Sequence, residues 1–300
     1  MGPLIGLILL FIVISVLNDS FIDPSNLKNL ARQISINALI AFGMTFVILT
    51  GGIDLSVGSI LALSSALMAS MITKGTNPEV AIVLSAVIGI LLGTVNGVII
   101  SYGKVAPFIA TLATMTIYRG ATLVFTNGNP ISGLSDDPIF TGFGQGFFLE
   151  IPVPAIVMLI AFFILFFILS KTPLGRQTYA VGGNEKVSYI SGIKIDRIKI
   201  FAYALTGCLC ALAGAILTAR LNSAQPTAGM GYELDAIAAV VLGGTSLAGG
   251  KGRISGTLIG ALIIGTLNNG LNILNVSSFY QQVVKGVVIL LAVLMDRKKN

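Results

Sequence analysis

The sequence predicts an all-α polytopic membrane protein with about ten transmembrane helices. Of its 300 residues, 55% are hydrophobic and only 10% are charged, and the mean hydropathy is +0.94. Soluble domains carry about 25% charged residues, so this composition does not fit a water-soluble fold. Several apolar runs also approach or exceed the roughly 20 residues that cross a bilayer as a helix. The lipid bilayer is therefore the expected surrounding of the chain.

Ten apolar runs follow one another along the whole sequence, and no stretch between them resembles a second domain. The runs cover residues 3–17, 36–50, 57–73, 79–101, 105–125, 153–170, 199–220, 234–247, 254–274 and 279–295. The runs at 36–50 and 234–247 are short for a crossing. Either could be a broken or re-entrant helix, which a bilayer tolerates only where protein or water covers the backbone. The first run lacks the basic leader and cleavage site of a signal peptide, so we expect one transmembrane domain over residues 1–300.

Basic residues in the connections predict the orientation, because cytoplasmic loops of membrane proteins are enriched in Lys and Arg. If the polar loop 171–198 is cytoplasmic, strict alternation places 51–56, 102–104, 248–253 and both termini on the same side. Twelve basic residues then share that side: Lys104, Lys171, Arg176, Lys186, Lys194, Arg197, Lys199, Lys251, Arg253, Arg297, Lys298 and Lys299. The other side has three: Lys28, Arg32 and Lys74. We expect both termini in the cytoplasm. The same bias explains the net charge of +6, so nucleic acid is not an expected partner.

Residue types that carry catalysis or bind metals are scarce. The chain has no histidine. Cys208 and Cys210 lie two positions apart in an apolar run, where a helix would point them to nearly opposite sides. A metal site and a redox pair are therefore not expected, and the chain has no plausible nucleophile and base for an intramembrane enzyme.

The energy source is not evident within the chain. Only Asp54, Glu233 and Asp235 lie near span ends and no acid lies in mid-span, whereas a proton-coupled carrier usually needs a titratable group inside the membrane. The segment "LAGGKGR" resembles a phosphate loop, but Thr245 and Gly252 stand where that motif needs Gly and Ser or Thr. We expect no ATP site in this chain, and we expect a separate partner protein to supply the energy for transport.

The stretch "AVGGNEKVSYISGIKIDR" (180–197) is the most polar run of the sequence. Asn184 is a good N-cap, Glu185 suits the positive end of a helix, and Gly192 is a good stop. The residues between them form about two turns, with Val187 and Ile190 as a small apolar face. Such a helix could lie on the membrane surface or fit a cleft in a cytoplasmic partner, and local physics does not separate these two interpretations.

Glycine patterns indicate close helix packing and a weak internal repeat. Gly89, Gly93 and Gly97 recur every fourth residue, a spacing that lets helices approach closely. The segments "GGIDLSVG" (51–58) and "GGTSLAGG" (243–250) share four positions. Paired glycine-rich breaks in two halves are typical of transporters built from repeats, although chance similarity between glycine-rich turns is the alternative.

Three stretches carry a resemblance to a known family: "TGGIDLSVGS", "GRQTYAVGGNEKVSYISGIKIDRIK" and "ARLNSAQPTAGMGYELDAIAAVVLGGTSLAGGKGRISGTLIGALIIGTLNNGLNIL". They closely resemble the permease subunit of bacterial ribose importers, in the branch of ABC transporters that handles ribose, xylose, galactose and the autoinducer sugar. The resemblance implies a ten-span permease that works as a homodimer in the bacterial cell membrane. It also implies a cytoplasmic ATPase that binds ATP and magnesium, and an extracytoplasmic sugar-binding protein. The alternative function is a facilitative or secondary sugar carrier that does not use ATP.

The resemblance also implies roles for single residues. The loop matching 182–192 is the family's coupling helix on the ATPase, and its candidate residues are Gly182, Gly183, Asn184, Glu185, Lys186, Val187, Tyr189, Ile190 and Gly192. A sugar offers only hydroxyl groups, so polar residues in or near spans are pathway candidates: Asn37, Asp54, Ser56, Asn96, Arg119, Asn268, Asn269 and Asn272. Each could instead bond a neighbouring helix, or, for Asp54 with Ser56, cap the helix that begins near Val57. Four residues in "SAQPTAGMGYELD" are expected on the outer side, as a binding-protein contact or an outer gate: Gln225, Pro226, Tyr232 and Glu233.

Overall fold

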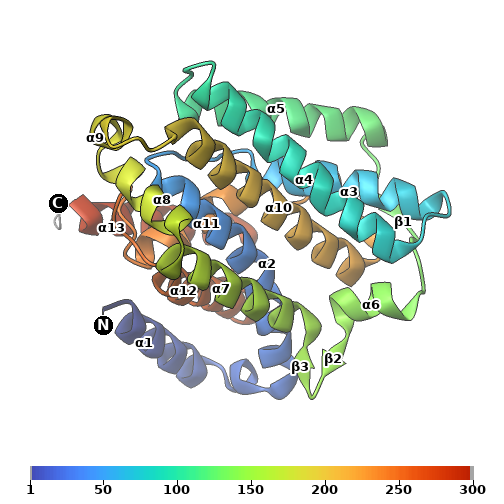
Figure 1. Cartoon of the computed structure of the whole chain (residues 1–300). Coiled ribbons are helices and arrows are strands. Elements are labelled where there is room, and N and C mark those ends of the chain that lie inside the picture. The colour runs from blue at the N-terminus through green and yellow to red at the C-terminus, as the bar shows by residue number, and fades with distance from the viewer. Residues whose placement is uncertain (1, 298–300) are drawn as a thin grey trace.

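The computed structural model describes residues 2–297 and is a bundle of helices with four very short strands (Figure 1). The helices are α1 (Gly2–Leu17), α2 (Pro24–Leu49), α3 (Val57–Thr73), α4 (Pro78–Ser101), α5 (Pro107–Thr126), α6 (Pro138–Gln145), α7 (Val153–Lys171), α8 (Pro173–Gly183), α9 (Glu185–Ile190), α10 (Ile195–Leu221), α11 (Tyr232–Leu242), α12 (Ile254–Ile273) and α13 (Ser278–Arg297), with a 3-10 turn η1 (Asp19–Ile22) after α1. The strands β1 (Ile131–Ser132) and β4 (Ser223–Ala224) pair antiparallel, as do β2 (Phe147–Phe148) and β3 (Ile151–Pro152).

Each of the ten predicted runs contains a helix, but the helices differ in length. Among the described residues, six are long and apolar enough to cross a membrane: α2, α4, α5, α7, α10 and α12. The helices α1 and α3 and the apolar part of α13 are shorter. The helix α11 has only 11 residues, which at 1.5 Å per residue span about 16 Å of a hydrocarbon core about 30 Å thick. The all-helical membrane class is confirmed, whereas ten complete crossings are not.

The helix boundaries follow local signals. A proline opens several of the helices, where its missing N–H would have no partner in any case; these residues are Pro24, Pro78, Pro107, Pro138 and Pro173. The left-handed residues Asn127 and Asn222 end α5 and α10, because asparagine adopts this conformation more readily than other non-glycine residues.

The expectation of a short segment at 36–50 is wrong, because α2 begins twelve residues earlier and has 26 residues. Its first turns are polar, which is why hydropathy missed them. There Lys28 forms an ion pair with Glu150 and lies over the ring of Phe147, and Arg32 stacks on the same ring. Hydrogen bonding to Lys28 lowers the pKa of the exposed Glu150 carboxyl group. These contacts hold the polar start of α2 against the β2–β3 hairpin.

Helix α2 lies at the centre of the bundle, and every residue from 38 to 49 is buried. The helices α7, α10, α11 and α12 pack around it. Glycines allow the closest approaches elsewhere: a Cβ added at Gly93 of α4 would collide with the carbonyl oxygen of Tyr203 on α10, and one at Gly260 of α12 would collide with that of Ala239 on α11. The predicted glycine seam on α4 is thus an interface with α10.

The connections gather at two ends of the bundle, which we name the α9 end and the β1 end after the elements found there (Figure 1). At the α9 end, Tyr179 donates a hydrogen bond to the carbonyl of Gly252 (2.8 Å) and the N–H of Gly250 donates to Leu49 (3.0 Å). Lys104 and Asp196 also face one another there, 3.8 Å apart. The loops that strict alternation places together therefore do lie together. Lys298 and Lys299, counted on this side, lie outside the described residues.

Candidate functional site

The predicted coupling helix is present as α9, and local contacts define both of its ends. The side chain of Asn184 accepts the N–H of Val187 (3.0 Å), as expected of an N-cap. After the last turn, Gly192 donates to Tyr189 and Ile193 donates to Ser188, each at 3.0 Å, and Gly192 has a φ of 82°. These two bonds make a Schellman stop. The predicted cap and the predicted stop are both confirmed.

The free face of α9 is apolar and projects from the molecule. Val187, Tyr189 and Ile190 are 58%, 74% and 84% exposed, whereas Ser188 on the opposite face is buried. Glu185 forms an ion pair with Lys199 at the start of α10, with both carboxylate oxygens 2.9 Å from the ammonium group. The helix is therefore tied to the bundle at its root and presents its apolar side chains outward.

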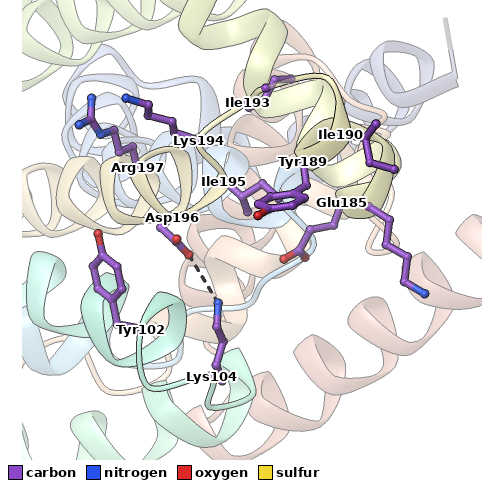
Figure 2. A pocket seen from close by; sticks show the side chains of 12 residues that line it. Tyr102, Lys104, Glu185, Tyr189, Ile190, Ile193, Lys194, Ile195, Asp196 and Arg197 are labelled. Atoms are coloured by element: carbon purple, nitrogen blue, oxygen red, sulfur yellow. Dashed lines mark ion pairs between the residues drawn. The ribbon is translucent and has the colours of Figure 1, made fainter.

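A large open groove lies beside α9, with a volume of about 1200 Å³. Figure 2 shows Tyr189, Ile190 and Ile195 on one wall and Tyr102 and Lys104, from the α4–α5 connection, on the other. Charged groups of both signs line it: Lys104, Glu185, Lys186, Lys194, Asp196 and Arg197. A knob of apolar side chains beside a charged groove is suited to docking a protein partner rather than a small solute.

The end of α8 is in close backbone contact with the end of α2 and with the 243–253 connection. A Cβ added at Gly182 would collide with the carbonyl oxygen of Leu49, at the end of α2, whereas one at Gly183 meets nothing within 4 Å among the described residues. The same Leu49 carbonyl accepts the N–H of Gly250. The two glycine segments that resemble each other in sequence also lie close together here, since a Cβ added at Gly249 would come within 3.0 Å of the backbone nitrogen of Gly51.

Asp54, Ser56 and Asn96 form a buried cluster at the start of α3. Asp54 accepts the N–H and the hydroxyl of Ser56 (2.8 and 2.6 Å), and Asn96 of α4 donates to the same hydroxyl oxygen (2.7 Å). The side chain of Ser56, although at the N-cap position, bonds no first-turn N–H. These contacts hold α3 to α4, as expected if the residues bond a neighbouring helix, whereas a cap of α3 by Asp54 and Ser56 is not confirmed.

The asparagines of α12 likewise bond neighbouring helices. Asn268 donates to Asp235 (3.3 Å), Asn269 exchanges hydrogen bonds with Asn26 (2.9 and 3.1 Å), and Asn272 accepts from Gln281 (2.8 Å). Asn37 is half-buried on α2 and makes no side-chain hydrogen bond with the described residues. The structure does not bring these four asparagines together in one site.

An ion pair within the bundle was not predicted. Lys285 of α13 lies 3.0 Å from Asp235 in the first turn of α11, and the side chains are 30% and 4% exposed. Asn268 donates to the same carboxylate oxygen. The only signal in the sequence was a lysine inside an apolar run; its partner, 50 residues away, could not be identified without the fold.

The segment around residues 223–235 holds the four residues expected as a binding-protein contact or an outer gate, and all four are buried or half-buried: Gln225, Pro226, Tyr232 and Glu233. Strand β4 pairs with β1, and the chain then enters the bundle as an irregular segment that packs on Gly58 in the first turn of α3. Pro226 is buried and its carbonyl accepts a 2.6 Å hydrogen bond from Arg119. Helix α11 starts only after this segment. Irregular backbone at this depth is tolerated because α3 and α5 cover it.

A cavity of about 400 Å³ lies where the irregular segment meets α3 and α5. Its lining includes Arg119, predicted as a pathway residue, and Glu233, predicted as a gate residue. It also includes Ser59 and Thr116, which sequence reasoning did not single out as site residues. Within residues 2–297, no group of His, Cys, Asp and Glu could hold a metal ion.

Comparisons with known proteins place the chain among membrane permeases. The family described as "Branched-chain amino acid transport system / permease component" matches residues 26–293. The "Ribose import permease protein RbsC" of Bacillus subtilis (strain 168) is 68% identical over 300 residues, covering 100% of this chain and 93% of the relative. The protein of the same name from Escherichia coli (strain K12) is 55% identical over 99% of this chain and 93% of the relative. The "D-allose transport system permease protein AlsC" of that strain is 44% identical over 93% and 85%. No solved structure matches.

Proposed function

The chain belongs to the family of transport-system permease components, and on that premise we propose that it is the permease subunit of an ATP-driven importer whose cargo is ribose. It is a transporter subunit and not an enzyme. The observation that carries the ribose assignment is identity of 68% and 55%, along nearly the whole chain, to two proteins named as ribose import permeases. Identity to the relative named for D-allose is lower, at 44%. A carrier that works without ATP finds no support in these relatives.

The arrangement in the membrane follows from the charge distribution. The α9 end carries most of the basic residues, so this end is taken as cytoplasmic, with the first and last described helices starting and ending there. All ten apolar helices lie in the membrane, α11 as a half-crossing that continues the irregular segment. The whole chain is treated as one permease domain, in the cell membrane of a bacterium.

Three partners complete the transporter. A cytoplasmic ATPase, which would supply the ATP and magnesium sites, docks on α9 and its groove. A second copy of this chain packs beside the first, and an extracytoplasmic sugar-binding protein delivers ribose at the β1 end. The support for the ATPase contact is the exposed apolar face of α9, because exposed apolar side chains beside polar groups mark protein docking sites.

The proposed coupling runs from α9 through α8 into α2. Closure of the ATPase displaces α9, the contact between Gly182 and Leu49 passes that movement to the central helix, and the pathway changes the side to which it opens. The motor can drive this change only if it binds the two permease states with different free energy.

Labelled ribose uptake into proteoliposomes tests this function. The vesicles contain this chain and its ATPase, with ATP inside and ribose-loaded binding protein outside, and xylose and galactose serve as competitors. We expect ATP-dependent uptake that the double variant Asn184→Ala/Glu185→Ala loses while it still inserts and binds the loaded binding protein. Uptake that proceeds equally without ATP would rule out the pump and favour the facilitative carrier.

The contact at Gly182 gives a sharper variant with a matched control. Gly182→Ala forces a Cβ against the carbonyl of Leu49, and overpacking of this kind costs about 1–3 kcal/mol. Where this cost falls on the state that transport has to reach, it corresponds to roughly a fivefold or greater loss of uptake. Gly183→Ala places the same methyl group in open space, and its uptake should stay within about twofold of the unsubstituted chain. Equal uptake by the two variants would contradict coupling through this contact.

A further inference from the structure

The cavity beside Arg119 lies at mid-depth in the bundle. Helix α5 starts at Pro107 at the α9 end, so Arg119 is about 18 Å along it and about 10 Å from its end at 1.5 Å per residue. The cavity volume of about 400 Å³ falls within the range of about 300–1,000 Å³ typical of small-molecule sites. Its depth and its size both suit a solute in transit.

The polar groups around the cavity are incompletely satisfied. Ser59, on α3, is 1% exposed, yet its hydroxyl has no hydrogen-bond partner within residues 2–297. Buried hydroxyls nearly always have a partner, and because this one lines the cavity it is available to a ligand bound there. One oxygen of Glu233 accepts the N–H of Gly231 (3.3 Å). Arg119 donates to the carbonyl of Pro226, and the ion pairs found among the described residues do not join Arg119 to Glu233.

The lining defines the chemical class of the ligand. Arg119 provides only donors, Glu233 only acceptors, and the hydroxyls of Ser59 and Thr116 provide both. The two formal charges cancel, so the cavity does not favour an ion. Met115, Leu123 and Met230 form its apolar part. A neutral polyhydroxylated molecule of monosaccharide size, with hydroxyl edges and apolar C–H faces, matches this set.

Lipid cannot be what covers the open side of this cavity. Thr116 and Gly120 are exposed on α5 and belong to the lining, so the cavity opens on the flank of the bundle. A charged side chain facing hydrocarbon at mid-depth costs several kcal/mol, and such residues face protein or a water-filled space instead. A second copy of the chain, placed with α5 toward α5, would cover the opening and leave a shared, wet passage between the copies.

From these observations we propose that this cavity is an intramembrane subsite for the transported sugar, with Arg119, Glu233 and Ser59 as the groups that contact its hydroxyls. The proposal rests on the proposed function and adds the place and the contacts at which the sugar crosses the membrane. A subsite with few polar contacts also binds weakly, as transport requires, since tightly held cargo would not be released.

Thiol accessibility tests the proposal in the assembled transporter. In a chain carrying Cys208→Ala and Cys210→Ala, Thr116→Cys places one thiol on the cavity wall. Val95→Cys, on the exposed flank of α4, places one toward lipid. We expect a charged, water-soluble methanethiosulfonate reagent to modify the first variant and not the second. Modification should lower ribose uptake about tenfold, and excess ribose with ATP should slow the modification.

The outcomes separate the subsite from the transport function. If Thr116→Cys resists the reagent as Val95→Cys does, or if its modification leaves ribose uptake unchanged, the subsite proposal fails while the importer assignment stands. If the unsubstituted chain imports no ribose in the same vesicles, the proposed function itself fails, and the subsite falls with it.

The isosteric variant Glu233→Gln provides a second readout. It keeps the shape of the side chain but replaces one acceptor oxygen with a donor group. We expect a several-fold rise in the ribose concentration at half-maximal uptake, or a changed order of competing sugars. An unchanged sugar profile would overturn the assigned contact.

Discussion

The two sides of α11 differ in how completely they are packed. Toward α12 and α13, Asp235 is paired with Lys285 and Asn268, and Gly260 allows the backbones to touch. Toward α3 and α5, Glu233 lines a cavity of about 400 Å³ beside the unpartnered hydroxyl of Ser59. The first turn of α11 thus carries one carboxylate held in an ion pair, Asp235, and a second that faces a cavity, Glu233.

This difference indicates which boundary moves during transport. The close contacts bind α11 to α12 and α13 as one unit, because interdigitated surfaces with satisfied polar groups resist separation. On the α3–α5 side the segment before α11 packs on Gly58, but the cavity beside Glu233 has room for both a ligand and a displacement. We therefore expect α11 to move with the C-terminal helices and against α5.

The largest effect should come from breaking the fixed side at its ion pair. Lys285→Gln leaves the carboxylate of Asp235, 4% exposed, without a cation. We expect a loss of about 3 kcal/mol, the low end for a broken buried pair because Lys285 is partly exposed. Denaturant unfolding in detergent measures it. Adding Asp235→Asn removes the unpaired charge and should restore at least half of the lost free energy of unfolding. If Lys285→Gln is as stable as the unsubstituted chain, the ion pair does not hold α11 to α13.

A smaller effect should distinguish the glycines of the two sides. Gly260→Ala would push a methyl group into the carbonyl of Ala239 and should lower the free energy of unfolding by about 1–3 kcal/mol. Gly120→Ala, on the open side, meets nothing within 4 Å among the described residues. It should leave stability unchanged or raise it by up to about 1 kcal/mol, because alanine favours helix. Thermal unfolding of the two variants under the same conditions measures this difference. Equal losses of stability would mean that the two sides of α11 do not differ in packing.

The smallest effect is expected from the amide pair of α12. Asn269→Ala removes the hydrogen bonds shared with Asn26, and bonds of this kind within membranes contribute about 0.6 kcal/mol on average. Ribose uptake per inserted molecule should stay unchanged, as it should for the exposed control Asn272→Ala. If Asn269→Ala loses ribose uptake while its stability is unchanged, Asn269 is a residue of the translocation pathway.

Local signals explain which parts of the fold could be predicted. Apolar length located a helix in each of the ten predicted runs, since it depends only on consecutive residues. The cap at Asn184 and the stop at Gly192 also depend on a few neighbouring residues, and both predictions are confirmed. The start of α2 was missed because its polar turns are stabilised by Phe147 and Glu150, more than a hundred residues away in sequence.

The site depends on contacts that no local pattern encodes. Arg119 and Glu233 were each singled out, but their meeting in one cavity depends on the chain returning into the bundle between β4 and α11. Hydropathy cannot reveal such a return, because Gln225–Gly231 is neither helical nor strongly apolar.

The brevity of α11 has a consequence for how the protein is made. A helix of 11 residues preceded by irregular backbone cannot partition into the bilayer alone, because its unpaired peptide groups would face hydrocarbon. We therefore expect it to enter the membrane only once α12 and α13 have been inserted and Lys285 can neutralise Asp235. The cavity beside Arg119 is then the last part of the chain to take shape during biogenesis, and nascent chains that end before α13 should be substrates for membrane quality control.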